Sequence, residues 1–241
     1  RPGVQHGALR PEGAVPLVGG TSLWFWEAGV LSRGAQPRRM PGGRIPEEVC
    51  QRLSFRRAAI AGLDMTQPQI MGILNVTPDS FSDGGRHSGV EAGCAAALRM
   101  VEEGASIIDV GGESTRPGAD FIPEDEEIAR TAPVIAAIRE VSQVAISIDT
   151  RKAEVAAETL EAGAGLINDV SGFTFDAALA PLAAQAGVPV CVMHAQGDPA
   201  TMQENPVYEN VLLDVYDFLA AQVDRLEATG VLRDRIVIDP G

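Results

Sequence analysis

The stretch that decides the fold runs from Ile70 to Gly85 and reads Ile-Met-Gly-Ile-Leu-Asn-Val-Thr-Pro-Asp-Ser-Phe-Ser-Asp-Gly-Gly. Its apolar start, residues 70–74, has the length and composition of a short buried strand. From Asn75 the stretch turns polar and rich in turn-forming residues. A core strand that runs into a loop carrying carboxylate, amide and hydroxyl groups is a common way to build the edge of an active site. An ordinary surface loop is the alternative, but the density of oxygen donors around Phe81 favours the functional interpretation.

The composition predicts helices packed on parallel strands. The chain has 241 residues, of which 45% are hydrophobic and only 5% aromatic, so its core consists mainly of Ala, Val, Ile and Leu. No apolar run is long enough to span a membrane, and the start lacks a secretory signal pattern, so we expect a cytoplasmic protein without a membrane partner. The three cysteines have no metal-binding or redox spacing, and we expect them to be reduced and buried.

Charge is unevenly distributed along the chain. Residues 1–66 carry nine arginines and five acidic residues, whereas residues 67–241 carry ten basic and twenty-eight acidic residues, a net charge of −18. So acidic a body argues against nucleic acid as a partner, because phosphate neutralisation dominates that binding. An anionic substrate would depend on a few placed cations or on a bound metal. Lys152 is the only lysine, so those cations are mostly arginines.

The first 66 residues differ from the rest and are interpreted as a separate N-terminal extension. They are rich in Gly, Pro and Arg and lack sustained periodicity. Residues 22–26 are expected to form a strand and residues 46–57 a short helix, with Pro46 in its first turn. We expect this extension to be a cap or hairpin on the domain formed by residues 67–241, with both tryptophans as packing anchors. A targeting peptide is the alternative that its arginines suggest.

From Ile70 onward one pattern repeats: an Ala-rich helix ends near a glycine, and an apolar strand follows that ends in a polar residue. The glycines fit the left-handed position after a helix. Alternation of this kind predicts a parallel sheet with right-handed crossovers. The expected strands are 70–74, 106–110, 145–148, 166–170, 188–193 and 235–239, and the expected helices are 90–103, 125–141, 152–162, 177–186 and 207–229.

Two α/β architectures fit this alternation, an open doubly wound sheet and a (β/α)8 TIM barrel. No G-x-G-x-x-G follows the first strand, which counts against a dinucleotide-binding fold. Polar residues recur at nearly every strand end, as expected for a barrel whose chemistry lies on one face. We therefore predict a barrel with about six of its eight strands in this chain. The sequence stops at a strand end, so we expect a fragment of a longer enzyme.

Three polar residues at strand ends are candidates for ligand binding: Asp149, Asn168 and Asp239. Strand ends converge in a barrel, and two carboxylates with an amide can hydrogen-bond a flat heterocycle. Taken singly, each residue is as well explained as a helix cap or turn anchor. Asp109 and Asp169 lie one step from the strand ends and are expected to serve structure through backbone or arginine pairing.

Two loops supply candidates for binding anions and metal. In the loop Gly111–Gly118, Thr115 and Arg116 combine a hydroxyl and a guanidinium, which suits phosphate or carboxylate, although a salt-bridged loop is the alternative. Asn75 and the carboxylates after it are the hard oxygen ligands that Mg²⁺ takes. The three histidines are scattered and include no pair spaced for zinc, and we expect His194 to be a rim residue rather than a base.

With these stretches assembled, residues 68–241 resemble the dihydropteroate synthase family. Asn75–Gly85 is similar to the family's first signature and Gly111–Gly118 to its second. The remaining matches follow in the family's order: Ser147–Thr150, Ile167–Val170, Met193-His194 and Asp239–Gly241.

The resemblance implies a barrel enzyme of folate biosynthesis, the target of sulfonamides, that joins a dihydropterin pyrophosphate to p-aminobenzoate and releases pyrophosphate. Its implied metal is Mg²⁺, and we expect a homodimer. The implied roles are as follows: Asn75 binds Mg²⁺ and pyrophosphate; Thr115 and Arg116 hold the pyrophosphate and the aminobenzoate side; Asp149, Asn168 and Asp239 bind the pterin; Met193 packs on its ring; and Phe81 and Asp83 lie on a closing loop.

Two rival interpretations stay open at this point. A pterin-dependent methyltransferase domain would share the barrel and the pterin-binding residues, but the loop from Asn75 to Gly85 speaks against it. A non-catalytic pterin-binding fragment is favoured by the missing strands, because the family continues with a seventh strand that carries a Lys and an eighth that ends in Arg-x-His. Release of pyrophosphate without a methyl donor separates these interpretations from the synthase.

Overall fold

A computed structural model of the protein describes residues 12–18, 23–77, 85–114, 121–196 and 206–241. The chain divides into two compact units. The N-terminal unit comprises residues 1–59 and 64–68, and the barrel unit comprises residues 60–63 and 69–241.

The barrel unit contains every strand and helix that the repeating pattern predicts. Its strands are β5 (Met71–Asn75), β6 (Ile107–Gly111), β7 (Ala145–Asp149), β8 (Leu166–Asp169), β9 (Val190–Met193) and β10 (Ile236–Asp239). Its helices are α2 (Gly85–Glu102), α3 (Glu124–Val141), α4 (Ala153–Glu161), α5 (Leu179–Ala186) and α6 (Val211–Thr229), with a 3-10 turn at Arg233–Arg235.

The largest differences from expectation are at the starts of two helices. α2 begins at Gly85, before the apolar periodicity that predicts it from residue 90. α6 begins at Val211 rather than at residue 207, because the side chain of Asn210 caps it by accepting a hydrogen bond from the Leu213 N–H at 3.2 Å.

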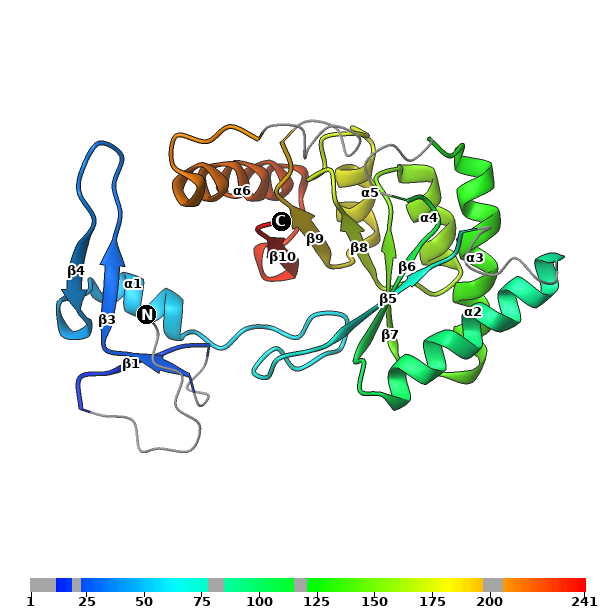
Figure 1. Ribbon diagram of the computed structural model, residues 1–241, viewed down its shortest axis with the longest axis horizontal. Helices are drawn as coiled ribbons and strands as arrows, with labels where there is room; N and C mark the ends of the chain where they lie inside the picture. The colour runs from blue at the N-terminus through cyan, green and yellow to red at the C-terminus, as the bar shows by residue number, and fades with distance from the viewer. Residues whose placement is uncertain (1–11, 19–22, 78–84, 115–120, 197–205) are drawn as a thin grey trace. The chain divides into compact units, whose positions relative to one another are not determined.

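The six strands form one parallel sheet in the order β10-β9-β8-β7-β6-β5, and the helices lie along its outer side (Figure 1). Strand order that follows the sequence without a reversal is the order of a β/α barrel, whereas a doubly wound sheet reverses at a switch point. The prediction of an α/β barrel with six strands is confirmed. β5 and β10 are the outer strands of this sheet.

The hydrophobic core lies between the sheet and the helices. Alternate strand residues point to it, and Ile108, Ile146 and Ile148 are completely buried there against Ile135 and Ile138 of α3. Burying one such side chain contributes about 1.5–3 kcal/mol. The residues between them in the strands face the other side of the sheet, which is where the polar strand-end residues lie.

Glycines end the helices as the sequence predicts. Gly187 after α5 has a φ of 65° and Gly230 after α6 a φ of 104°. Both are in the left-handed region, which closes the last helical turn and costs other residues about 1–2 kcal/mol. Each helix therefore ends at its glycine, and the chain can enter the next strand.

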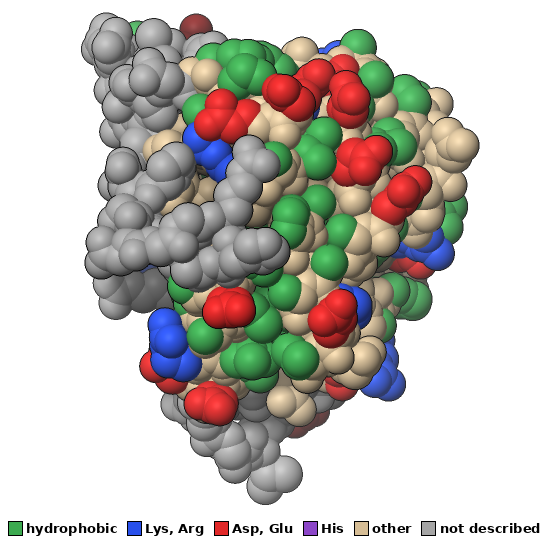
Figure 2. All heavy atoms as spheres, turned by 90° about the vertical axis from the view of Figure 1, so that its right-hand side faces the viewer, with side chains coloured by type: hydrophobic (Ala, Val, Ile, Leu, Met, Phe, Trp, Pro, Cys, Tyr) green, Lys and Arg blue, Asp and Glu red, His purple; other side chains and the backbone are tan. Residues whose placement is uncertain are grey.

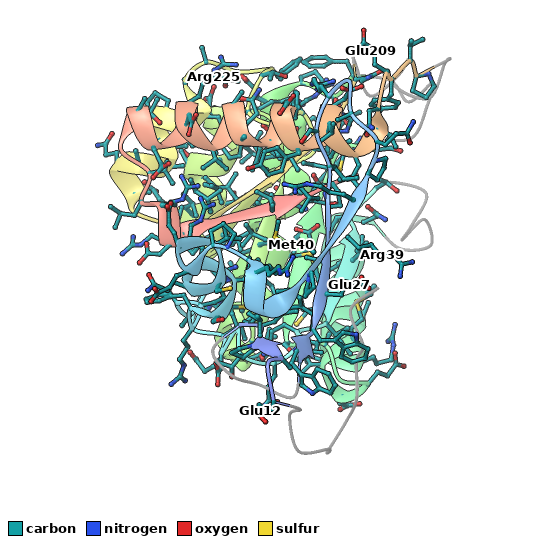
Figure 3. The ribbon with its side chains drawn as sticks, turned by 90° about the vertical axis from the view of Figure 1, so that its left-hand side faces the viewer. Glu12, Glu27, Arg39, Met40, Glu209 and Arg225 are labelled. Atoms are coloured by element: carbon teal, nitrogen blue, oxygen red, sulfur yellow. The ribbon has the colours of Figure 1, made fainter. Side chains whose placement is uncertain are left out.

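The N-terminal unit is built from two short antiparallel sheets and a helix. β1 (Val15–Pro16) pairs with β2 (Trp24–Phe25), and β3 (Glu27–Val30) forms a hairpin with β4 (Arg38–Pro41), followed by the 3-10 turn η1 (Gly42–Arg44) and by α1 (Glu47–Ser54). Glu27 and Arg39 form an ion pair of 3.4 Å across this hairpin (Figure 3).

Two details of the N-terminal unit differ from the prediction. The expected strand at residues 22–26 belongs to two different sheets, and the helix ends at Ser54 because Phe55 is extended. Only Trp24 is a packing anchor: it is buried, whereas Trp26, which stacks on it with a centroid separation of 5.2 Å, is half exposed.

Acidic side chains outnumber basic ones on one face of the barrel unit (Figure 2). On the side of α2 and α3, carboxylate side chains are dispersed among apolar ones and basic side chains are fewer (Figure 2). None of the described helices is both long enough and apolar enough to cross a membrane.

We predict that Gly112→Ala lowers the free energy of unfolding by about 1–3 kcal/mol. A Cβ at Gly112 would lie 2.8 Å from Cγ2 of Thr131 and 3.2 Å from the carbonyl oxygen of Glu127, so α3 would have to move away from the end of β6. Urea unfolding measures the change. Gly89→Ala in α2 is the matched control, because no atom lies within 4 Å of its new Cβ and helix propensity should raise stability by about 0.5–1 kcal/mol. Equal effects of the two substitutions would contradict the close packing of α3 on Gly112.

Candidate functional site

Strand register places the candidate residues in one row across the sheet. Asn75 pairs with Gly111, Gly111 with Asp149, and Asp149 with Asn168. All four are at or next to the carboxyl ends of parallel strands, and because they are in register the side chains of Asn75, Asp149 and Asn168 lie on the same side of the sheet. Amide and carboxylate groups that are 19 and 74 residues apart in the sequence are thereby brought into one row.

Gly111 keeps a gap open in this row. A Cβ at this position would lie 3.4 Å from Oδ2 of Asp149 and 3.7 Å from Oδ1 of Asn75. These contacts are ordinary van der Waals distances, so the glycine is not required by sterics. Its effect is to leave the two oxygen-bearing side chains facing a shared space rather than a methyl group.

Asp109, which lies two residues before Gly111 in β6, binds the side-chain amide of Asn168. Its carboxylate accepts a hydrogen bond from Nδ2 of Asn168 at 3.0 Å and a short one from the Ser147 hydroxyl. With its N–H bound in this way, Asn168 presents its carbonyl oxygen as the acceptor for a ligand. Burial raises the pKa of Asp109, and the two hydrogen bonds reduce that rise.

This role of Asp109 differs from the expectation. The sequence predicts backbone or arginine pairing, whereas the carboxylate binds two side chains within the site. Ser147 is part of a sequence match to the family, but no role of its own is predicted for it. The signal that finds both is the period of two in a strand: Asp109 and Gly111, like Ser147 and Asp149, point to the same side of the sheet.

Asp149 is the most electrostatically strained group of the row. Burial raises its pKa well above the ordinary carboxyl value, and the negative charges of Asp109, Asp169, Glu127 and Glu113 raise it further. None of the side chains in the described ranges donates a hydrogen bond to this carboxylate. It is therefore available to accept hydrogen bonds from a ligand that carries N–H groups.

Met193 and Asp239 lie opposite each other at the ends of β9 and β10. The Met193 side chain is half-buried, and the exposed Asp239 carboxylate accepts a hydrogen bond from the Gly241 N–H at 2.9 Å.

Cys191 pairs with Asn168 in the row. Burial, followed by the charges of Asp239, Asp109 and Asp149, raises the pKa of its thiol to about 12, so this cysteine is a neutral wall of the site. The three cysteines are free but only half-buried, contrary to the expectation of full burial.

Asp169 pairs with backbone groups, as the sequence predicts, and His194 is buried just after β9. Asp169 accepts hydrogen bonds from the backbone N–H groups of Ser171 and Phe173 at 2.7 and 2.8 Å, which holds Phe173 at a φ of 60°. His194 is buried, and its ring packs edge-on against that of Phe218 with the ring centroids 5.0 Å apart. Its backbone N–H donates to the Asp239 carbonyl oxygen at 2.9 Å, which ties the ends of β9 and β10 together.

Four predicted site residues lie outside the described part of the chain: Phe81, Asp83, Thr115 and Arg116. Glu113, which precedes Thr115 in the same loop, is described and belongs to a buried ionic network. Its members are Glu113, Glu127, Arg151 and Lys152. The salt-bridged loop considered as an alternative is thus present at Glu113. Sequence reasoning missed this network, although the single lysine of an acidic chain was a signal for it.

Asn75 is the described residue that could hold a metal. Across the described ranges, no group of three or more His, Cys, Asp or Glu side chains is arranged around a metal site. Mg²⁺ needs no such group, since it commonly takes one or two protein oxygens and completes its shell with water and substrate phosphates. The exposed amide oxygen of Asn75, beside the gap left by Gly111, fits that requirement.

Comparison with known proteins agrees with this arrangement. Dihydropteroate synthase from Escherichia coli K12 is 48% identical over 179 residues, which are 74% of this chain and 63% of the relative. The enzyme from Synechocystis is 47% identical over 71% of this chain and 60% of its own length. The chain thus spans slightly less than two thirds of the curated relatives that it matches.

Solved structures and a family match lead to the same group. Yersinia pestis dihydropteroate synthase in complex with a sulfonamide drug superposes with a TM-score of 0.69 at 45% identity, covering 74% of this chain and 65% of that one. The Xanthomonas albilineans enzyme with 4-aminobenzoic acid superposes with a TM-score of 0.70 at 43% identity, covering 77% of this chain and 66% of that one. The family described as "Pterin binding enzyme" matches residues 71–241. The resemblance inferred from the two signatures is confirmed, and the chain belongs to the family of pterin-binding enzymes.

Proposed function

We propose that this chain carries the active site of a dihydropteroate synthase, which joins a dihydropterin pyrophosphate to p-aminobenzoate and releases pyrophosphate. The observation that carries the proposal is the register that aligns Asn75, Asp149 and Asn168, with Asn168 held by Asp109. Relatives that are 45–48% identical bear this name.

The row suits the recognition of a pterin. A pterin presents several N–H donors and ring acceptors along one edge, and the side-chain oxygens of Asp149 and Asn168 are acceptors for its N–H groups. Asp239 extends the polar edge, and Met193 provides an apolar surface for the ring. Hydrogen bonds from such a site to a flat heterocycle give orientation as well as affinity.

The reaction replaces a C–O bond with a C–N bond. The bond between the methylene carbon and pyrophosphate breaks, its electron pair leaves with the pyrophosphate, and the electron-rich dihydropterin stabilises the positive charge on the methylene. The neutral amine of p-aminobenzoate then attacks that carbon and loses a proton. In this mechanism Asp149 and Asn168 hold the ring in place, so that the methylene is near the anion-binding side.

Arg116 and Thr115 hold the pyrophosphate and the aminobenzoate side in this proposal, since a guanidinium stabilises charge that develops on a leaving anion. Phe81 and Asp83 belong to a loop that excludes water as a competing nucleophile. The support for these four roles is their position in the two signatures.

Mg²⁺ is the proposed metal, with Asn75 as its protein ligand. When bound, it would supply positive charge beside the departing pyrophosphate. We expect a chelator to reduce pyrophosphate release at least tenfold and added Mg²⁺ to restore it. Activity that is unaffected by chelation would contradict the metal assignment.

We also infer a homodimer in the cytoplasm. The exposed apolar side chains Val211, Leu212 and Tyr216 on α6 are compatible with self-association. Sedimentation of the purified chain and fractionation of cells test these two points.

The function is tested by measuring pyrophosphate release from the dihydropterin pyrophosphate with p-aminobenzoate and Mg²⁺. We expect turnover by the chain, and a loss of at least 100-fold in Asp149→Asn and in Arg116→Ala, since one removes a pterin acceptor and the other the anion's guanidinium. Ligand binding without turnover would favour the non-catalytic pterin-binding interpretation. Turnover that requires a methyl donor would favour the methyltransferase.

Asp149→Asn should also change how stability depends on pH. The pKa of Asp149 is raised in the folded state, so its ionisation costs stability, and this cost appears as pH rises from the ordinary carboxyl pKa, about 3.9, through the raised value. We therefore expect the variant to melt at a higher temperature than the parent at pH 7. The difference should vanish towards pH 4.

Thermal unfolding at several pH values measures this effect, with Asp224→Asn, an exposed position on α6, as the control. A variant that is less stable than the parent at pH 7, or a gain that is the same at every pH, would show that Asp149 does not bear this electrostatic cost.

A further inference from the structure

Lys152, which follows the end of β7, is buried in a site built from oxygen atoms. Only 1% of the residue is exposed. Its Nζ lies 2.5 Å from the Ile122 carbonyl oxygen, 2.6 Å from Oε2 of Glu127 and 3.3 Å from Oε2 of Glu113. Nζ donates hydrogen bonds to the first two of these oxygens and forms an ion pair with the third.

The same network joins the two ends of the segment between Glu113 and Ile122. Oε1 of Glu113 accepts a hydrogen bond from the Ile122 N–H at 3.1 Å, and Lys152 binds the Ile122 carbonyl oxygen. Both backbone groups of Ile122 are therefore held by side chains that meet each other at 3.3 Å. Thr115 and Arg116, the proposed anion-binding residues, lie between these two positions in the sequence.

Arg151 completes the network from the other side of Glu113. Its guanidinium donates two hydrogen bonds of 3.2 Å to the Glu113 carboxylate and lies 4.1 Å from the centre of the Phe175 ring. Burial would raise the pKa of Glu113, but the hydrogen bonds from Arg151 and Ile122 and the charge of Lys152 hold it below its usual value. Glu113 is thus an ionised anchor, and Arg151 is engaged in holding it.

Stability alone does not explain a buried ionic network. Removing charges from water costs several kcal/mol per ion, and apolar replacement of such a pair is often neutral or stabilising. The network joins the end of β6, the first turn of α3 and the end of β7, and all three border the row of candidate residues. Its directional hydrogen bonds fix where these elements stand relative to one another.

We propose that Lys152 is a positioning residue that clamps Glu113 to Ile122 and thereby supports pyrophosphate binding, because the proposed anion-binding residues Thr115 and Arg116 lie between these two positions in the sequence. The proposal rests on the proposed function, because that function assigns the anion to those residues. The ammonium group of Lys152 is buried and bound by Ile122, Glu127 and Glu113, so its proposed role is to position residues and not to contact substrate.

The test removes the clamp without leaving an unpaired charge. Lys152→Met alone would bury Glu127 without a partner and could prevent folding, so it is combined with Glu127→Leu. Arg139→Met is the matched control: Arg139 also binds backbone carbonyl oxygens, those of Val144 and Gly163 at 2.9 Å, but at the amino-terminal end of β7. Calorimetry measures the affinity of each protein for pyrophosphate with Mg²⁺ and for 6-hydroxymethylpterin.

We expect the double variant to bind pyrophosphate at least tenfold more weakly, with its affinity for the pterin changed less than twofold. The Arg139 variant should bind both ligands as the parent does. The proposal is overturned if the double variant keeps its pyrophosphate affinity, or if it loses both affinities equally, which is what general destabilisation would cause.

A second measurement observes the clamp directly. Because Lys152 is the only lysine, a chain labelled with ¹⁵N-lysine has a single side-chain ammonium signal. We expect this signal to persist through slow proton exchange, and the Ile122 amide to exchange at least tenfold faster in the double variant than in the parent. An ammonium group that exchanges like free lysine, or an unchanged Ile122 amide, would refute the clamp.

Failure of the proposed function would look different. If the parent chain binds neither pyrophosphate nor the pterin, the function is wrong, and the clamp is then decided by the exchange rates of the Lys152 ammonium and the Ile122 amide. If the parent binds both ligands and the double variant behaves as the parent does, the function stands and the positioning role is wrong.

Discussion

The parallel pairing of β5, β6, β7 and β8 is the constraint on which the candidate site depends. Register sets Asn75, Gly111, Asp149 and Asn168 side by side, and a shift of one residue in any strand would turn its side chain into the helix-packed core. The completely buried isoleucines that alternate with these residues prevent that shift, because it would expose them. The hydrophobic core therefore determines the geometry of the polar site.

This arrangement gathers negative charge. Burial raises the pKa values of Asp109, Asp149 and Asp169, and repulsion by neighbouring carboxylates raises that of Asp149 further. The protein offsets this cost at two of the three carboxylates. Asp109 and Asp169 are bound by donors supplied by the chain, whereas Asp149 has none among the described residues. A carboxylate left without donors beside two that are satisfied is the pattern of a group that is kept for a ligand.

The sequence predicted the barrel well because its signals are local and repeated. Apolar strands, Ala-rich helices and glycine caps such as Gly187 each depend on a few neighbouring residues. Polar strand ends predicted Asp149 and Asn168, since convergence is a property of the fold. Asp109 and Lys152 could not be found in this way, because their partners lie 38 and 59 residues from Asp109, and 25 and 30 residues from Lys152, along the chain. Such contacts exist only once the strands are paired.

The ionic network also explains why the proposed site needs further positive charge. Arg151 and Lys152 follow β7 closely in the sequence, and both are neutralised by Glu113 and Glu127. A pyrophosphate would therefore meet carboxylates whose charge is not balanced by free cations of the described part of the site. Stabilising the anion then requires charge from elsewhere, and this is the physical argument for both Arg116 and a divalent metal. Arg151 and Lys152 thus help to position the elements around the site, whereas Arg116 and the metal would supply the electrostatic attraction for the pyrophosphate.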